Sequence, residues 1–168
     1  MAVGFRDPLG DGTITVTNSD ADGFYALRVF MKPDLDDGNR HLGTDWNAAS
    51  DANELAYSSY GGTIAYASAN AGSSRGGVVM VNHTLPEGSK FTTVYMHLEH
   101  IPSAILNGTQ TTVGRGEFLG DSGFVKTGWG LHVHYEVREG HQTGLSGVGY
   151  GYYGGTGQGT LVNSGISN

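Results

Sequence analysis

Hydrophobic runs rich in β-branched and aromatic residues recur along the chain, separated by Gly- and Asp-rich stretches. Runs of about four to eight such residues between turn-forming residues are typical of β-strands. We predict strands at residues 13–17, 23–30, 62–68, 77–83, 91–98 and 131–138. Helical signals are confined to residues 51–57 and 101–106, each sufficient for one or two turns. The pattern therefore predicts a mainly β fold.

The composition favours short strands and tight turns over packed helices. Glycine contributes 29 of the 168 residues, and only 15% of the residues are charged. Glycine readily adopts the positive φ angles that tight turns require. The length suits one hydrophobic core and not two. We therefore expect a single domain over residues 1–168, in which residues 139–168 form a Gly- and Tyr-rich C-terminal extension.

The charge balance narrows the classes of partner. The formal net charge is −7, with only nine basic residues, which argues against nucleic acid and against anionic membrane as partners. No apolar run approaches the ~18–20 residues that a membrane span needs, so we expect no span. The chain contains no cysteine, so any metal site must be built from His, Asp or Glu.

The last predicted strand carries proton-active side chains in an alternating pattern. Because side chains of a strand point to opposite faces in turn, His132, His134 and Glu136 share one face. The intervening apolar residues, Leu131, Val133, Tyr135 and Val137, form the other face and are expected to enter the core. A strand does not need three polar groups in a row for packing, so this face is a candidate site.

Two further segments contribute candidate residues. In residues 91–99 we expect one apolar face, formed by Val94, Met96 and Leu98, and a second face, formed by Tyr95, His97 and Glu99. In residues 41–45, an extended backbone would point His41, Gly43 and Asp45 the same way, and Gly43 would leave open space for a metal ion.

These residues could together form a catalytic zinc site. Such a site needs three nitrogen or oxygen ligands and one open position for water. Two ligands from one strand and a histidine from another can converge across a sheet, and two remaining histidines could then carry protons and polarise a carbonyl. The strand pattern alone does not distinguish His132 from His134 as the ligand.

Six segments, in order, resemble the lysostaphin/LytM-type zinc peptidases. The family's H-x-G-x-D motif matches HLGTD at 41–45, and its G-x-V-x-x-A segment is similar to GTIAYA at 62–67. Its V-x-I-x-H strand matches VMVNH at 79–83, and its Y-x-H-L motif matches YMHL at 95–98. Its H-[LV]-H-[FY]-E motif matches HVHYE at 132–136, and its G-[ST]-[ST]-G turn loosely matches GDSG at 120–123. The resemblance covers residues 22–138.

The resemblance implies a fold, a cofactor and site residues. The implied fold is an antiparallel β-sheet groove, the duplicated hybrid motif. One zinc ion would be held by His41, Asp45 and His134, and His97 and His132 would be catalytic. The implied activity is hydrolysis, by a metal-activated water, of Gly- or D-Ala-containing peptide cross-links in bacterial peptidoglycan. A monomer that is secreted or periplasmic, with its signal peptide removed, is expected.

One feature departs from the family pattern. Many active members carry a tyrosine shortly before the first ligand, where it stabilises the oxyanion of the transition state. Residues 31–40 contain no tyrosine, and Tyr25 is the nearest candidate. The oxyanion stabiliser therefore stays unassigned at the level of sequence.

Two other functions are possible for such a chain. Metal-free domains of the same fold bind and activate cell-wall amidases, but they typically lose one or more ligands, and all five positions are present here. A calcium- or carbohydrate-binding module is suggested only by the acidic segment 18–23 and the tyrosines of the tail. Position twelve of a calcium loop would be Val29, which cannot bind calcium, so a side-chain-stabilised turn is the better interpretation.

The remaining polar candidates have simpler interpretations. His83 ends an apolar strand, and a structural or metal-supporting role is favoured over direct ligation. His100 and His141 are expected at the surface. Glu136 could orient a catalytic histidine or form a plain ion pair on the strand face, and the sequence favours neither interpretation.

Overall fold

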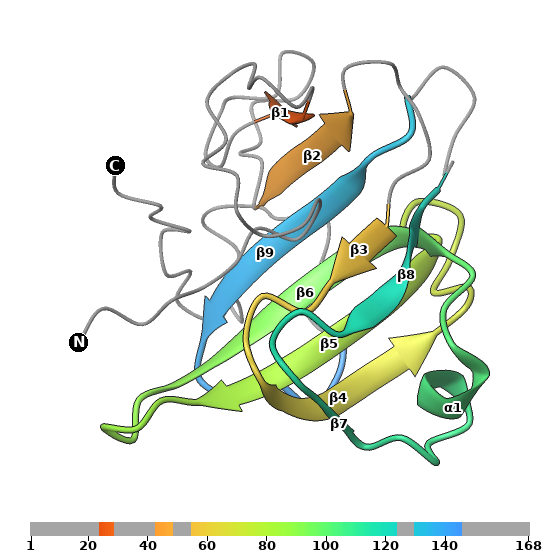
Figure 1. The fold of residues 1–168 in the computed structure, drawn as a ribbon. Coiled ribbons are helices and arrows are strands. Elements are labelled where there is room, and N and C mark those ends of the chain that lie inside the picture. Colours follow the sequence, from red (N-terminus) through yellow and green to blue (C-terminus); the bar gives the residue numbers. More distant parts are fainter. Residues whose placement is uncertain (1–23, 29–42, 49–54, 124–129, 146–168) are drawn as a thin grey trace.

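The computed structural model describes residues 24–28, 43–48, 55–123 and 130–145. The predicted strand at 13–17, the acidic segment 18–23 and the tail tyrosines lie outside these ranges. Within them the chain forms nine strands and one short helix (Figure 1). The strands are β1 (Phe24–Arg28), β2 (Thr44–Ala48), β3 (Leu55–Tyr57), β4 (Gly62–Ser68), β5 (Gly77–Thr84), β6 (Lys90–Glu99), β7 (Thr112–Val113), β8 (Phe118–Ser122) and β9 (Val133–Glu139). The helix α1 spans Ser103–Leu106.

All strand pairs in the described part of the chain are antiparallel and belong to one sheet. The strands follow the order β1-β2-β9-β6-β5-β4-β7, and β8 pairs with both β3 and β6. The predicted mainly β, antiparallel fold class is therefore confirmed. None of the helices described is long and apolar enough to cross a membrane.

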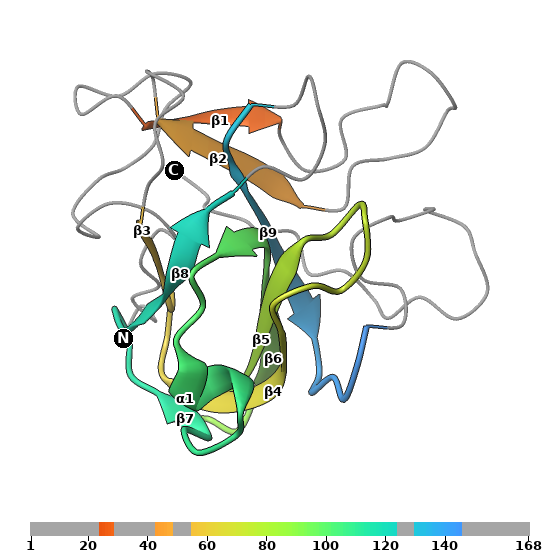
Figure 2. The same cartoon turned by 90° about the vertical axis from the view of Figure 1, so that its right-hand side faces the viewer.

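The sheet folds over so that its two parts enclose the main core. Figures 1 and 2 both place β3 and β8 over one face of β5 and β6. Side chains from both layers meet there, including Ala56 of β3, Leu119 of β8, Val79 of β5, Tyr95 of β6 and Tyr135 of β9. A smaller apolar cluster, formed by Val78, Met80, Val94 and Met96, is separate from this core.

One predicted element is wrong and others were not foreseen. Residues 55–57, part of the predicted helix 51–57, form strand β3, which pairs with β8. The pairing satisfies backbone groups through a partner that lies more than 60 residues away, so local helix propensity does not decide the outcome. The predicted helix at 101–106 is confirmed as α1. The strands β2, β7 and β8 have too little hydrophobic periodicity to be recognised locally.

Candidate active site

Two candidate ligands face each other across neighbouring strands. Asp45 of β2 and His134 of β9 are register partners, so their side chains project from the same face of the sheet. The Nδ1 atom of His134 lies 2.8 Å from Oδ1 of Asp45, and both residues are buried. The neighbouring pair in the register, Trp46 and Val133, packs on the opposite face in the main core. The predicted alternation of polar and core residues in β9 is confirmed.

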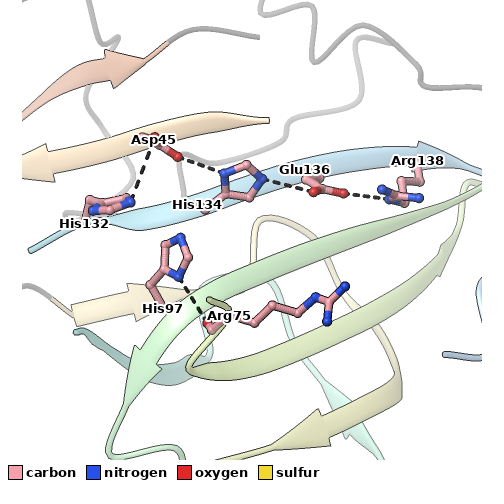
Figure 3. A network of polar contacts seen from close by, with 7 residues as sticks. All are labelled: Asp45, Arg75, His97, His132, His134, Glu136 and Arg138. Carbon is pink, nitrogen blue, oxygen red and sulfur yellow. Dashed lines mark hydrogen bonds and ion pairs between the residues drawn. The ribbon is translucent and has the colours of Figure 1, made fainter. Parts of the chain in front are cut away.

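His134 lies between two carboxylates. Its second ring nitrogen, Nε2, is 3.0 Å from Oε1 of Glu136 (Figure 3). Burial alone would lower the pKa of His134, but the hydrogen bonds and charges of Asp45 and Glu136 outweigh it and raise the pKa to about 9. In the metal-free chain, His134 is therefore an imidazolium that donates to both carboxylates.

Glu136 joins the histidine to a buried arginine. Its other oxygen, Oε2, accepts a hydrogen bond of 2.7 Å from Nε of Arg138. Burial tends to raise the pKa of Glu136, but the hydrogen bond and charge of His134, together with Arg138, lower it below its usual value. Glu136 therefore contacts His134, the predicted metal ligand, and forms the ion pair with Arg138 that the sequence allowed.

His132, the residue directly before β9, approaches the carboxylate of Asp45. Its Nδ1 atom lies 2.7 Å from the carbonyl oxygen of Gly130. A carbonyl can only accept, so Nδ1 carries the proton and donates it. The opposite nitrogen, Nε2, is 3.9 Å from Oδ2 of Asp45. His132 is therefore held in a fixed tautomer beside Asp45.

A β-bulge brings His97 to the site. Leu98 pairs with Gly77 and Met96 pairs with Val78, so His97 is an extra residue on β6, and its φ angle is +65°. Strict alternation would place His97 with Tyr95 in the main core. The bulge instead turns its ring towards His132 and His134, with centroid distances of 4.7 Å and 5.9 Å.

The predicted faces of this strand are therefore wrong in detail. Val94 and Met96 share the small apolar cluster as expected, but Leu98 joins Tyr95 in the main core. The reason is the bulge, which shifts the alternation by one residue after Met96. His97 faces the other histidines because of this irregularity.

The ring of His97 is oriented by the loop between β4 and β5. Its Nδ1 atom is 3.1 Å from the carbonyl oxygen of Arg75, which also accepts the backbone N–H of His97 at 2.9 Å. Nδ1 therefore carries the proton, and Nε2 keeps its lone pair. Burial first, and then electrostatic interactions with the neighbouring His132 and His134 rings, lower the pKa of His97 to about 3.

The expected open space beside Gly43 is corrected by the structure. A Cβ atom on Gly43 would lie 2.6 Å from Nε2 of His134 and would collide with the carbonyl oxygen of Tyr135. The imidazole of His134 occupies the space that glycine provides. Gly43 therefore allows close packing of this histidine and leaves no gap for an ion at that point.

The donor set fits a zinc site that a third residue must complete. The predicted ligand His41 lies outside the described residues, and within them no group of three His, Cys, Asp or Glu side chains could hold a metal. Asp45 and His134 are nevertheless both buried, and Oδ1 of Asp45 faces Nδ1 of His134 with a proton between the two atoms. These are donors that zinc accepts, and a cation could replace the bridging proton.

The other histidines lie away from this cluster. His83 is buried, with Nδ1 2.9 Å from the carbonyl oxygen of Gly61 and Nε2 2.7 Å from the hydroxyl of Thr93. His100 and His141 are exposed, as predicted. The role of Arg138 was not foreseen from the sequence, although its spacing of two from Glu136 is the available signal. The side chain of Tyr25 is outside the described residues.

Comparison with known proteins places this arrangement in a family. The family model "Peptidase family M23" matches residues 39–144, which include all five predicted site residues. Among curated proteins, none matches the chain at a significant level.

Solved structures share the fold at low sequence identity. Lysostaphin, an antimicrobial peptidase from Staphylococcus simulans, is 17% identical with a TM-score of 0.58, over 98% of this chain and 63% of that one. The catalytic domain of EnpA, a prophage-encoded M23 protein from Enterococcus faecalis, is 22% identical with a TM-score of 0.54, over 81% and 95%. A chain of the SpoIIQ-SpoIIIAH pore-forming complex is 18% identical with a TM-score of 0.57, over 87% and 85%.

Proposed function

Because the chain belongs to peptidase family M23, we propose that it is a zinc-dependent endopeptidase that cleaves peptide cross-links of bacterial peptidoglycan. The observation that carries the proposal is the buried pair of Asp45 and His134, flanked by the rings of His97 and His132. A cluster of one carboxylate and three histidines costs free energy to bury, so it indicates chemistry and not packing.

Each residue has a role that its contacts support. Asp45 and His134, with His41, would hold the zinc ion. When bound, zinc acts as a Lewis acid that polarises a peptide carbonyl and lowers the pKa of water to ~7. His97 and His132 each donate Nδ1–H to a backbone carbonyl, so each presents Nε2 in a fixed tautomer. These two nitrogens would move protons between the attacking water and the leaving amine.

The substrate and location follow from the proposed activity. Gly- and D-Ala-containing bonds are the proposed targets, since they have small side chains that allow close approach of the peptide. Because peptidoglycan lies outside the cytoplasmic membrane, the enzyme would act as a secreted or periplasmic protein, and we propose that it is a monomer.

The first test is metal content combined with activity. We expect close to one zinc per chain in the purified protein, and loss of zinc in His41→Ala, Asp45→Ala and His134→Ala, because each variant lacks one of three protein ligands. Elemental analysis measures occupancy, and mass analysis of digested peptidoglycans of known cross-bridge type identifies the bond. Full zinc occupancy in all three variants would show that the ligand assignment is wrong.

The second test separates ligands from proton carriers. His97→Ala and His132→Ala should keep zinc and lose at least ~10²-fold in turnover, the usual contribution of a positioned acid–base group. His100→Ala, which removes an exposed imidazole, is the matched control and should keep both zinc and turnover. If His132→Ala loses zinc while His134→Ala keeps it, the two histidines have exchanged roles.

A protein-binding function is the second candidate, because a chain of similar fold occurs in the SpoIIQ-SpoIIIAH complex. A regulatory domain that activates cell-wall amidases would need no metal. The described cluster of Asp45, His97, His132 and His134 favours the enzyme. A purified protein without zinc that stimulates an amidase would favour the regulatory domain.

A further inference from the structure

Arg138 is the largest side chain that is fully buried in the described part of the chain, with 1% of its surface exposed. Arginine is rarely fully buried unless it is paired, because its guanidinium must exchange hydration for protein hydrogen bonds. Its Nε donates a hydrogen bond of 2.7 Å to Oε2 of Glu136, which is also fully buried. A simple strand-face ion pair in water would not require this burial.

The pair continues directly into the candidate zinc site. His134, Glu136 and Arg138 alternate along one face of β9, and Figure 3 shows them in a line that ends at Asp45. Each carboxylate oxygen of Glu136 has a separate partner: Oε2 contacts Arg138, and Oε1 lies 3.0 Å from Nε2 of His134. The orientation of the carboxylate therefore links the arginine to the histidine.

We propose that Arg138 is a positioning residue which, by holding Glu136, fixes the His134 imidazole with Nδ1 towards Asp45 and so sets the metal affinity of the site. This inference rests on the proposed zinc-dependent function. Arg138 contacts one oxygen of Glu136 and His134 contacts the other, so the proposed effect is transmitted by the carboxylate between them.

The surroundings explain why the arginine is needed. Val94 and Met96 are the register partners of Glu136 and His134 on β6, and these two apolar side chains cannot donate a hydrogen bond to the carboxylate. Without Arg138, the buried carboxylate would lose a charged partner and could turn away from the ring. A ring that loses its Nε2 partner can rotate, and Nδ1 would then no longer face Asp45. Removing the hydrogen-bond partner of a metal-ligating histidine typically weakens metal binding by about 10–100-fold.

A double-mutant cycle tests transmission through Glu136. Zinc affinity is measured by competition with a chelator at one pH for the wild type, Arg138→Met, Glu136→Gln and the double variant. We expect Arg138→Met to weaken zinc binding by about 10–100-fold. In the Glu136→Gln background, the same change should have a several-fold smaller effect, because the two residues act as one unit. Equal effects in both backgrounds would overturn the proposal.

Two further variants separate positioning from folding. Arg138→Lys keeps the positive charge and should recover part of the affinity that Arg138→Met loses. Thr92→Val is the control, because Thr92 is the register partner of Arg138, is equally buried, and donates to the carbonyl oxygen of Gly140 at 2.9 Å. It should lower the unfolding temperature without changing zinc affinity. If zinc affinity falls in Thr92→Val as much as in Arg138→Met, the effect is general destabilisation and the proposal fails.

A metal-free measurement distinguishes failure of this proposal from failure of the proposed function. If the wild type binds no zinc, the zinc peptidase proposal fails, and the ring of His134 is then followed by NMR through its ¹⁵N shifts and Nε2–H signal. A changed ring environment in Arg138→Met, but not in Thr92→Val, would support the positioning role. Identical spectra in the wild type and Arg138→Met would overturn it.

Discussion

The imidazole of His134 connects protonation to metal binding. Its two nitrogens lie 2.8 Å from Asp45 and 3.0 Å from Glu136, so in the metal-free chain both nitrogens donate protons. Zinc binds only the deprotonated form of a ring nitrogen. The metal must therefore displace the proton that Asp45 and His134 share.

We predict that zinc binding releases about one proton per chain at neutral pH. The hydrogen bonds and charges of Asp45 and Glu136, acting against burial, raise the pKa of His134 to about 9, so His134 is protonated at pH 7 before zinc binds. Apparent affinity should rise about tenfold per pH unit from neutrality towards pH 9. Calorimetry in two buffers of different ionisation enthalpy measures the release. Zinc binding without proton release would show that His134 is neutral or is not a ligand.

Strand β9 and His132, which directly precedes it, place three members of the site at alternate positions. His132, His134 and Glu136 follow the period of two that the sequence indicates, and the residues between them enter the core.

The strand β6 departs from this period at His97. A non-glycine residue at φ +65° costs of the order of 1 kcal/mol or more, and the surrounding pairing of β6 with β5 and β8 maintains it.

The approach of β2 to β9 depends on a glycine. We predict that Gly43→Ala displaces the ring of His134 and weakens zinc binding by at least ~10-fold, as expected for loss of ligand orientation. The added Cβ would lie 2.6 Å from Nε2 of His134. Gly144→Ala is the matched control, because a Cβ at Gly144 meets no atom within 4 Å. Chelator competition measures both variants, and equal wild-type affinity in both would mean that β2 can shift to accommodate the methyl group.

At the scale of the whole molecule, one histidine, His83, is buried in the fold away from the candidate zinc site. His83 is fully buried in β5, stacked on Phe91 with a centroid distance of 4.7 Å, and hydrogen-bonded to Gly61 and Thr93. Burial lowers the pKa of His83, and the carbonyl of Gly61 opposes this only partly. The neutral ring is therefore the form that the fold accommodates.

This lowered pKa predicts how stability depends on pH. Below the unfolded-state pKa of ~6.5, the unfolded chain binds a proton at this residue that the folded chain does not. The contribution of His83 to the free energy of unfolding is therefore complete above about pH 6.5. It is lost as the pH falls, and the free energy of unfolding then drops by up to about 1.4 kcal/mol per pH unit. In metal-free His83→Gln, the free energy of unfolding should therefore fall less steeply than in the wild type between about pH 6.5 and 5. Denaturant unfolding at several pH values measures this slope.

A second variant controls for stability itself. Thr93→Val removes the hydroxyl that contacts Nε2 of His83 but keeps the imidazole. It should lower the unfolding free energy while preserving the acid slope. A His83→Gln variant with the wild-type slope would show that other groups cause the acid sensitivity.

The sequence by itself determined the mainly β fold class and most of the long strands, because a half-buried strand leaves its period of two in the order of residues. It also identified the polar face of β9 and the residue types suited to a metal site. Elements with little periodicity, such as β3 and β8, became visible only through their pairing with each other.

The tertiary structure decided which of these residues meet. Asp45 and His134 are separated by 89 residues, and only the register of β2 against β9 places them in contact. The bulge that turns His97 to the site, the packing of His134 against Gly43, and the burial of Arg138 behind Glu136 likewise depend on neighbouring strands. Register, bulges and burial arise from contacts between distant segments, and such contacts leave no local period in the sequence.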